Sequence, residues 1–162
     1  MEARGPIAKP LQLLVDLLAA SSSFRARAGA TTDDEARKRL HWPHLAVEIW
    51  EVERPCAVIM QAKGSPKARW KASGGRNLLR WSGQLDVLIA DNDRFPDDLQ
   101  ESQIDFETYL GCVMDDVRRY AAEDDKLAVS AIDVVEPAAY SNLIDLPSVT
   151  PFWIAKFRVD WE

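Results

Sequence analysis

The chain has only two histidines, His41 and His44, and their H-x-x-H spacing could offer two ligands to a metal ion. Pro43 lies between them and prevents a regular helix. No cysteine or group of acids adjoins them, whereas a structural zinc site takes four protein ligands. We therefore predict that both histidines pack in a turn or in the core and bind no metal.

A second pattern is similar to the metal site of restriction-type nucleases. Glu48 or Glu53 precedes the apolar run at 56–60, and Gln61 and Lys63 follow it with one residue between them. Such an enzyme needs two acidic groups to hold Mg²⁺ and a lysine to stabilise the attacking hydroxide. Glutamine replaces one acid poorly, and the aspartate expected just before the strand is missing. A degenerate nuclease is the enzymatic alternative, but a solvated edge-strand Lys63 is favoured.

Two pairs of adjacent acids, Asp115 with Asp116 and Asp124 with Asp125, could bind a cation. They lack the glycine turn and the terminal glutamate of a calcium loop, so solvated helix surface is the favoured interpretation. The chain also has no glycine-rich nucleotide-binding motif and no G-x-S-x-G motif. The sequence therefore predicts no catalytic residue, no metal ligand and no cofactor.

The charged residues between positions 63 and 80 are all basic. Turn formers gather at 64–67 and 73–75, so we expect residues 64–76 to form a long, exposed basic hairpin loop. Between positions 91 and 125 acids dominate instead, and such a division of charge suits subunits that stack head to tail. The predicted interaction residues are Lys63, Lys67, Arg69, Lys71, Arg76 and Arg80.

The helices that position these residues are predicted from apolar spacing and capping residues. A helical stripe that begins at Leu11 predicts a first helix that fades across Ser21, Ser22 and Ser23 and stops near Gly29. Thr32 followed by Glu35 predicts a capping box that opens a short helix through Arg39. A long helix is expected to begin near Pro96 and to pack on the sheet through residues Phe106, Tyr109, Leu110, Val113, Val117 and Tyr120.

Alternating apolar and polar residues predict the strands. Gly83 is expected to form a bulge in the third strand, and 137–151 is expected to be a loop. The result is an α/β protein of the α+β kind, with a mostly antiparallel sheet of about five strands and helices packed on one face. The expected strands begin at Leu45 and Cys56 and then span about 77–89, 128–135 and 153–161.

Length and composition set the broad class. The 162 residues, of which 47% are hydrophobic, are enough for one domain over residues 1–162, with a flexible N-terminus at 1–9. The apolar run at 11–20 is too short to span a bilayer, and Cys56 and Cys112 are expected to be buried thiols in a reducing compartment. The net charge of −6 argues against a general nucleic-acid binder.

Several local sequences resemble the tail-terminator and neck proteins of long-tailed phages, which complete tails and join them to heads. The resemblance lies in Ser-Ser-Ser-Phe near the end of the first helix, Arg-Leu-His-Trp-Pro at 39–43 and Phe-Pro-Asp at 95–97. It also includes the central hairpin and the last strand, Trp-Ile-Ala-Lys-Phe-Arg-Val-Asp-Trp at 153–161.

This resemblance implies a virion structural protein that is assembled in the host cytoplasm and works in the tail or neck. Such proteins form rings, typically hexamers, that cap the tail tube and join it to the head connector. The resemblance implies no enzyme activity, no cofactor and no membrane, and the basic loop would contact a neighbouring subunit, the connector or, transiently, DNA. A small non-catalytic binding module is the other alternative, beside the nuclease.

Overall fold

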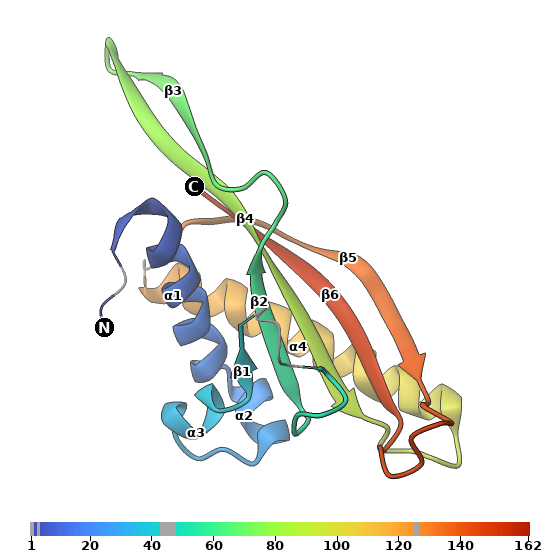
Figure 1. The fold of residues 1–162 in the computed structure, drawn as a ribbon. Helices are drawn as coiled ribbons and strands as arrows, with labels where there is room; N and C mark the ends of the chain where they lie inside the picture. Colours follow the sequence, from blue (N-terminus) through green and yellow to red (C-terminus); the bar gives the residue numbers. More distant parts are fainter. Residues whose placement is uncertain (1, 3, 43–47, 125–126) are drawn as a thin grey trace.

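The computed structural model describes residues 2, 4–42, 48–124 and 127–162. These residues form four helices and one six-stranded sheet, with the helices packed against the sheet (Figure 1). The predicted α/β class and the mostly antiparallel sheet are confirmed. In chain order the elements are α1 (Gly5–Ala20), α2 (Ser22–Ala28), α3 (Asp33–Arg37), β1 (Leu40–His41), β2 (Cys56–Gln61), β3 (Lys67–Ser73), β4 (Arg76–Asn92), α4 (Leu99–Asp124), β5 (Val129–Ser141) and β6 (Phe152–Trp161).

Helix α1 begins earlier than its apolar stripe indicates. It starts at Gly5, so residues 5–9, which were expected to be flexible, are helical. The chain is interrupted at Ser21, whose Oγ accepts a hydrogen bond from the Phe24 N–H at 3.2 Å and caps α2. No helix in the described ranges is long and apolar enough to cross a bilayer.

The predicted stops and caps of the next helices are present. Gly29 ends α2 in the left-handed conformation, with φ of 65°. Thr32 Oγ1 accepts from the Glu35 N–H at 3.2 Å, and the Glu35 carboxylate accepts from the Thr32 N–H at 3.3 Å. The capping box is therefore confirmed, and it opens α3.

The sheet is organised around β4, which has 17 residues. The strand order is β1-β2-β4-β6-β5, with β3 paired to β4 outside this path, and only β1 with β2 is parallel. The sequence pattern did not predict β1 or β3. The strand expected from Leu45 falls largely outside the described residues, and Ile49 lies in a turn.

One face of the sheet packs against the helices and forms the main core. Alternate residues of β2, β4 and β6 are buried there, which explains the clean apolar alternation of the last strand. The predicted apolar face of α4 is confirmed, because Phe106, Tyr109, Leu110, Val113 and Val117 are all buried. The strand residues of this core include Ala57, Ile59, Leu85, Val87, Ile89, Trp153, Ala155, Phe157, Val159 and Trp161.

Two boundaries differ from the predicted ones. Strand β5 runs through Pro137, where a loop was expected, and register shifts between Val134 and Glu136 and between Glu136 and Ala139 interrupt its pairing there. Proline is tolerated at a bulge on an edge strand. Helix α4 begins at Leu99 rather than at Pro96.

Candidate interaction surface

The basic segment forms a β-ribbon rather than the expected loop over 64–76. β3 pairs with the first seven residues of β4, from Lys67 with Ser82 to Ser73 with Arg76. Gly74 and Gly75 join the strands with φ of 58° and 77°, as a two-residue hairpin turn of type I′ requires. The ribbon projects beyond the rest of the sheet (Figure 1). The turn formers at 64–66 and 74–75 therefore mark its two ends.

The ribbon has two chemically different faces. Residues that pair across an antiparallel ladder lie on the same face, and the faces alternate along each strand. The basic face carries Lys67, Arg69, Lys71, Arg76 and Arg80, together with Leu78. The apolar face carries Ala68, Trp70, Ala72, Leu79 and Trp81, together with Asn77.

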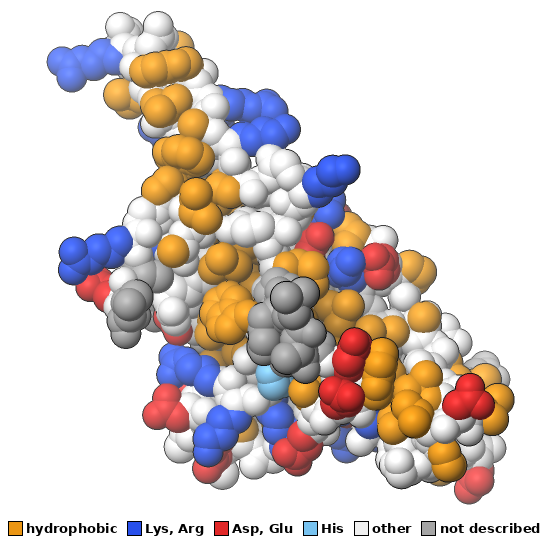
Figure 2. Space-filling model, viewed as in Figure 1, with side chains coloured by type: hydrophobic (Ala, Val, Ile, Leu, Met, Phe, Trp, Pro, Cys, Tyr) orange, Lys and Arg blue, Asp and Glu red, His pale blue; other side chains and the backbone are white. Residues whose placement is uncertain are grey.

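The apolar face is open to solvent. Trp70 is 70% exposed and Leu79 is 49% exposed. By alternation along β4, Leu79 and Trp81 lie on the same side of the strand as Leu85, which belongs to the core. Figure 2 shows hydrophobic side chains along the ribbon, with Lys and Arg at its margins. The apolar side of the sheet thus continues beyond the part that the protein's own helices cover.

Most of the charges on the basic face have no ion-pair partner among the described residues. Lys71 lies 3.4 Å from Glu162, and among the described residues this is the one ion pair of the five bases on this face. Arg69 pairs directly with Arg80 across the ladder. Like charges in that position destabilise a two-stranded ribbon. Lys63, the sixth predicted interaction residue, lies in the turn after β2 at the root of the ribbon.

The root of the ribbon is tightly packed at Gly83. A Cβ atom there would lie 2.7 Å from the Trp161 ring and from Ser65 Oγ. The predicted bulge at Gly83 is wrong, because Gly83 pairs in register with Trp161 and Ser82 with Lys67. Glycine is needed here for close approach. A hollow of about 320 Å³ lies beside it, lined by Lys63, Ser65, Lys67, Arg69, Asp160 and Glu162 among others.

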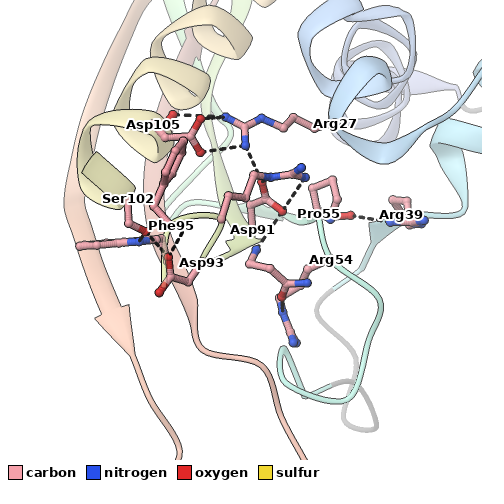
Figure 3. A network of polar contacts seen from close by, with 12 residues as sticks. Arg27, Arg39, Arg54, Pro55, Asp91, Asp93, Phe95, Ser102 and Asp105 are labelled. Carbon is pink, nitrogen blue, oxygen red and sulfur yellow. Dashed lines mark hydrogen bonds and ion pairs between the residues drawn. The ribbon is translucent and has the colours of Figure 1, made fainter. Parts of the chain in front are cut away.

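A buried polar network lies at the end of β4 (Figure 3), whereas the ribbon contains the first residues of that strand. Asp91 accepts from Arg27 of α2 at 3.3 Å and from Arg94 at 3.0 Å, and it is almost fully buried. Arg27 also donates to Asp105 of α4 at 2.8 Å. Its guanidinium lies 4.8 Å from the centre of the Tyr109 ring, and burial raises the pKa of that tyrosine. The network fastens α2 and α4 to the end of β4.

A second group of contacts fixes the two neighbouring loops. Asp93 accepts from the Ser102 and Tyr140 hydroxyls, the latter at 3.0 Å, and its N–H donates to the Pro151 carbonyl at 2.8 Å. Trp153 Nε1 donates to Ser102 Oγ at 2.8 Å. Loops 93–98 and 142–151 are therefore joined to each other and to the start of α4.

These two loops and the start of α4 expose a second apolar area, which we call the distal surface. It consists of Phe95, Leu99, Ile144 and Leu146, of which Ile144 is 84% exposed and Leu99 is 57% exposed. The loops lie at the opposite end of the molecule from the ribbon (Figure 1). Exposed acids occupy the same segments, namely Asp97, Asp98, Glu101 and Asp145.

The structure does not bring the nuclease candidates together. Glu53 and Lys63 lie beyond opposite ends of β2, and the six residues of that strand separate them by roughly 17 Å or more. Glu53 instead pairs with Arg39 at 2.8 Å. Gln61 Nε2 donates to the Ile7 carbonyl at 3.2 Å. Glu48 is exposed. The described residues contain no group of three or more metal-binding side chains.

The remaining candidate ligands are the two histidines and the adjacent acids. His44 and Asp125 lie outside the described residues, and His41 is in β1. Asp115 pairs with Arg118 on the surface at 2.7 Å. Asp116 is buried rather than solvated, and it accepts hydrogen bonds from the Ser21 hydroxyl and the Ser23 N–H at 2.7 and 3.0 Å.

Burial alone would raise the pKa of the Asp116 carboxyl, but these hydrogen bonds outweigh it and lower that pKa. The two cysteines also differ. Cys56 is buried, which raises its pKa to about 12, whereas Cys112 is exposed and so corrects the expectation that both are buried.

No protein-family model matches this chain, and a search of curated proteins finds no match. The surfaces of the protein are therefore the guide to its function. Sequence reasoning found the bases of the ribbon but missed its apolar face, although Ala68, Trp70 and Ala72 alternate with bases in the pattern of a strand. It also missed the distal surface, because isolated apolar residues in a loop carry no periodic signal.

Proposed function

We propose that this chain is an assembly subunit that closes into a ring, with the ribbon of one copy packed on the distal surface of the next. The observation that carries this proposal is the apolar face of the ribbon, which continues the core side of the sheet and which no other described segment of the chain covers. Exposed apolar areas of this kind typically bury themselves against another protein. The occupant is a second copy, because the chain carries a complementary area at its other end.

The two surfaces differ in residue content and lie at opposite ends of the molecule, so the contact is head to tail. A heterologous contact gives a ring when its rotation closes and a filament when it does not. The ribbon is basic and the segments of the distal surface carry exposed acids, so their opposite charges favour encounter at low salt. We expect the assembly to weaken as salt increases.

The ring belongs to the tail or neck of a phage-like particle, where it caps the tail tube and joins it to the head connector. This part of the proposal is supported by the resemblance of the N-terminal helix, the hairpin and the last strand to tail-terminator and neck proteins. The order of helices, central hairpin, long helix and two final strands agrees with that resemblance.

Two double variants test the contact between the ribbon and the distal surface. Trp70→Ser with Leu79→Ser removes the apolar face, and Leu99→Ser with Ile144→Ser removes the distal surface. Sedimentation velocity should show closed oligomers for the wild type, with rings in negative-stain electron microscopy, and monomers for each variant. Mixing the two variants leaves one intact ribbon and one intact distal surface, so the mixture should form a one-to-one dimer that cannot grow.

The matched control is Val134→Ser, which removes an exposed apolar residue from the edge strand β5 and should leave the ring intact. A wild type that stays monomeric at its highest soluble concentration contradicts the proposal. Self-dimers of the distal-surface variant contradict the head-to-tail arrangement, since they would require contact between two ribbons.

A further inference from the structure

The basic face of the ribbon is directed away from the surface that the proposed ring contact uses. The apolar and basic side chains lie on opposite faces of a two-stranded ribbon. A flat partner that covers Trp70 and Leu79 therefore leaves the five bases uncovered. The basic face needs a ligand of its own.

We propose that the basic face binds the phosphate backbone of duplex DNA. Arg69 and Arg80 are paired across the ladder, and neither forms an ion pair with another described residue, so a polyanion would relieve their mutual repulsion. Four of the five bases on this face have no ion-pair partner among the described residues. Their guanidinium and ammonium groups are therefore available to phosphates.

The shape of the ribbon also fits a duplex. The major groove of DNA admits a two-stranded β-ribbon. Seven residues in each strand make this one roughly 23 Å long. β3 contributes three of the bases and β4 contributes two, so long side chains extend from both strands toward the phosphates that border a groove. The binding has no sequence preference, because it rests on phosphate contacts.

The acidic body limits this contact to the ribbon. The chain has a net charge of −6 although the ribbon is strongly basic, so the rest of the surface repels DNA. Five phosphate contacts give weak, strongly salt-dependent binding, with a slope of log affinity against log salt of about −4.5. Between 50 and 200 mM salt the affinity should therefore fall about 500-fold.

Fluorescence anisotropy with a labelled duplex of arbitrary sequence tests the inference, in the wild type and in the Trp70→Ser, Leu79→Ser variant. Both should bind at 50 mM salt, because the substituted residues lie on the other face. Replacing Arg69, Arg76 and Arg80 with Gln should weaken binding more than tenfold and reduce the salt slope by about 2.7. The control replaces Lys9, Lys38 and Arg118 with Gln, which removes the same charge from other exposed sites and should change affinity less than threefold.

Two further ligands separate duplex DNA from other polyanions. A single strand of the same sequence should bind more weakly than the duplex, and poly-glutamate should not displace the duplex at equal charge concentration. Absence of duplex binding at 100 μM protein in 50 mM salt overturns the inference. Preference for the single strand or for poly-glutamate also overturns it, and the latter would indicate an acidic protein surface. A ring that forms without binding DNA refutes this inference alone and leaves the proposed assembly intact.

Discussion

The ribbon and the distal surface both expose apolar side chains beside charged ones, yet different interactions hold them in place. The ribbon depends on a local ladder of backbone hydrogen bonds between β3 and β4. The distal surface depends on buried side chains from α2, β4, α4 and β6 that meet at Asp91, Asp93 and Ser102. Substitutions on the ribbon should therefore change binding alone, whereas substitutions beneath the distal surface should change stability as well.

The largest difference in stability is expected between two variants that each lose one arginine, one beneath the distal surface and one on the ribbon. Arg27→Met leaves Asp105 and the buried Asp91 without one of their partners, so it should lower the free energy of unfolding by about 3 kcal/mol. Arg69→Met removes an exposed base and should change it by less than about 0.5 kcal/mol. Urea unfolding measures both, and similar losses for the two variants would contradict the comparison.

The second effect tests the boundary between the ribbon and the body. Gly83→Ala places a methyl group against the Trp161 ring, so it should destabilise the protein by about 1–3 kcal/mol. Gly111→Ala is the control, because its new Cβ in α4 meets no atom within 4 Å beyond its chain neighbours and the adjacent backbone of its own helix. That variant should be neutral or up to about 1 kcal/mol more stable, since alanine favours a helix. Equal stability of the two variants would show that the root is loosely packed.

A third effect depends on pH and concerns the body alone. The pKa of Asp116 is lower in the folded chain than in the unfolded one, so its contribution is complete above about pH 4, near the ordinary pKa of aspartate. The contribution is lost as pH falls through the lower folded pKa. The difference in melting temperature between the wild type and Asp116→Asn should therefore shrink from pH 6 to pH 3. A difference that grows on acidification would refute this assignment.

The smallest change in stability is expected where the change in charge is greatest. Replacing Lys67, Arg69 and Lys71 with Glu reverses three charges on exposed strand positions, and thermal unfolding should shift by the equivalent of no more than about 0.5 kcal/mol. The same variant should lose DNA binding, and the long-range repulsion between its acidic ribbon and the acids of the distal surface should slow ring assembly and particle completion. Normal folding together with unchanged DNA binding and full, infectious particles would reduce the basic face to a solvated surface.

The sequence predicted the body well because periodic burial leaves a periodic pattern. The last strand and α4 each bury one face, and their apolar residues recur with the period of the strand or helix. The capping box and the Gly29 stop follow from local backbone chemistry, which needs no knowledge of distant residues.

The surfaces were less predictable because they depend on residues far apart in the chain. The distal surface unites residues 95–99 with residues 144–146, and contacts such as Tyr140 with Asp93 bring them together. Nothing local marks Asp91 as buried, since its partner Arg27 lies 64 positions away. In the ribbon, the turn formers at both ends concealed a strand whose alternation was regular.

The in-register ladder of the ribbon also has an evolutionary consequence. Adding two residues to each strand at the Gly74–Gly75 turn would lengthen the ribbon by about 7 Å while keeping every existing side chain on its face. Adding a single residue to one strand would instead reverse the faces of that strand beyond the insertion. The reach of this element can thus change in discrete steps without altering the body.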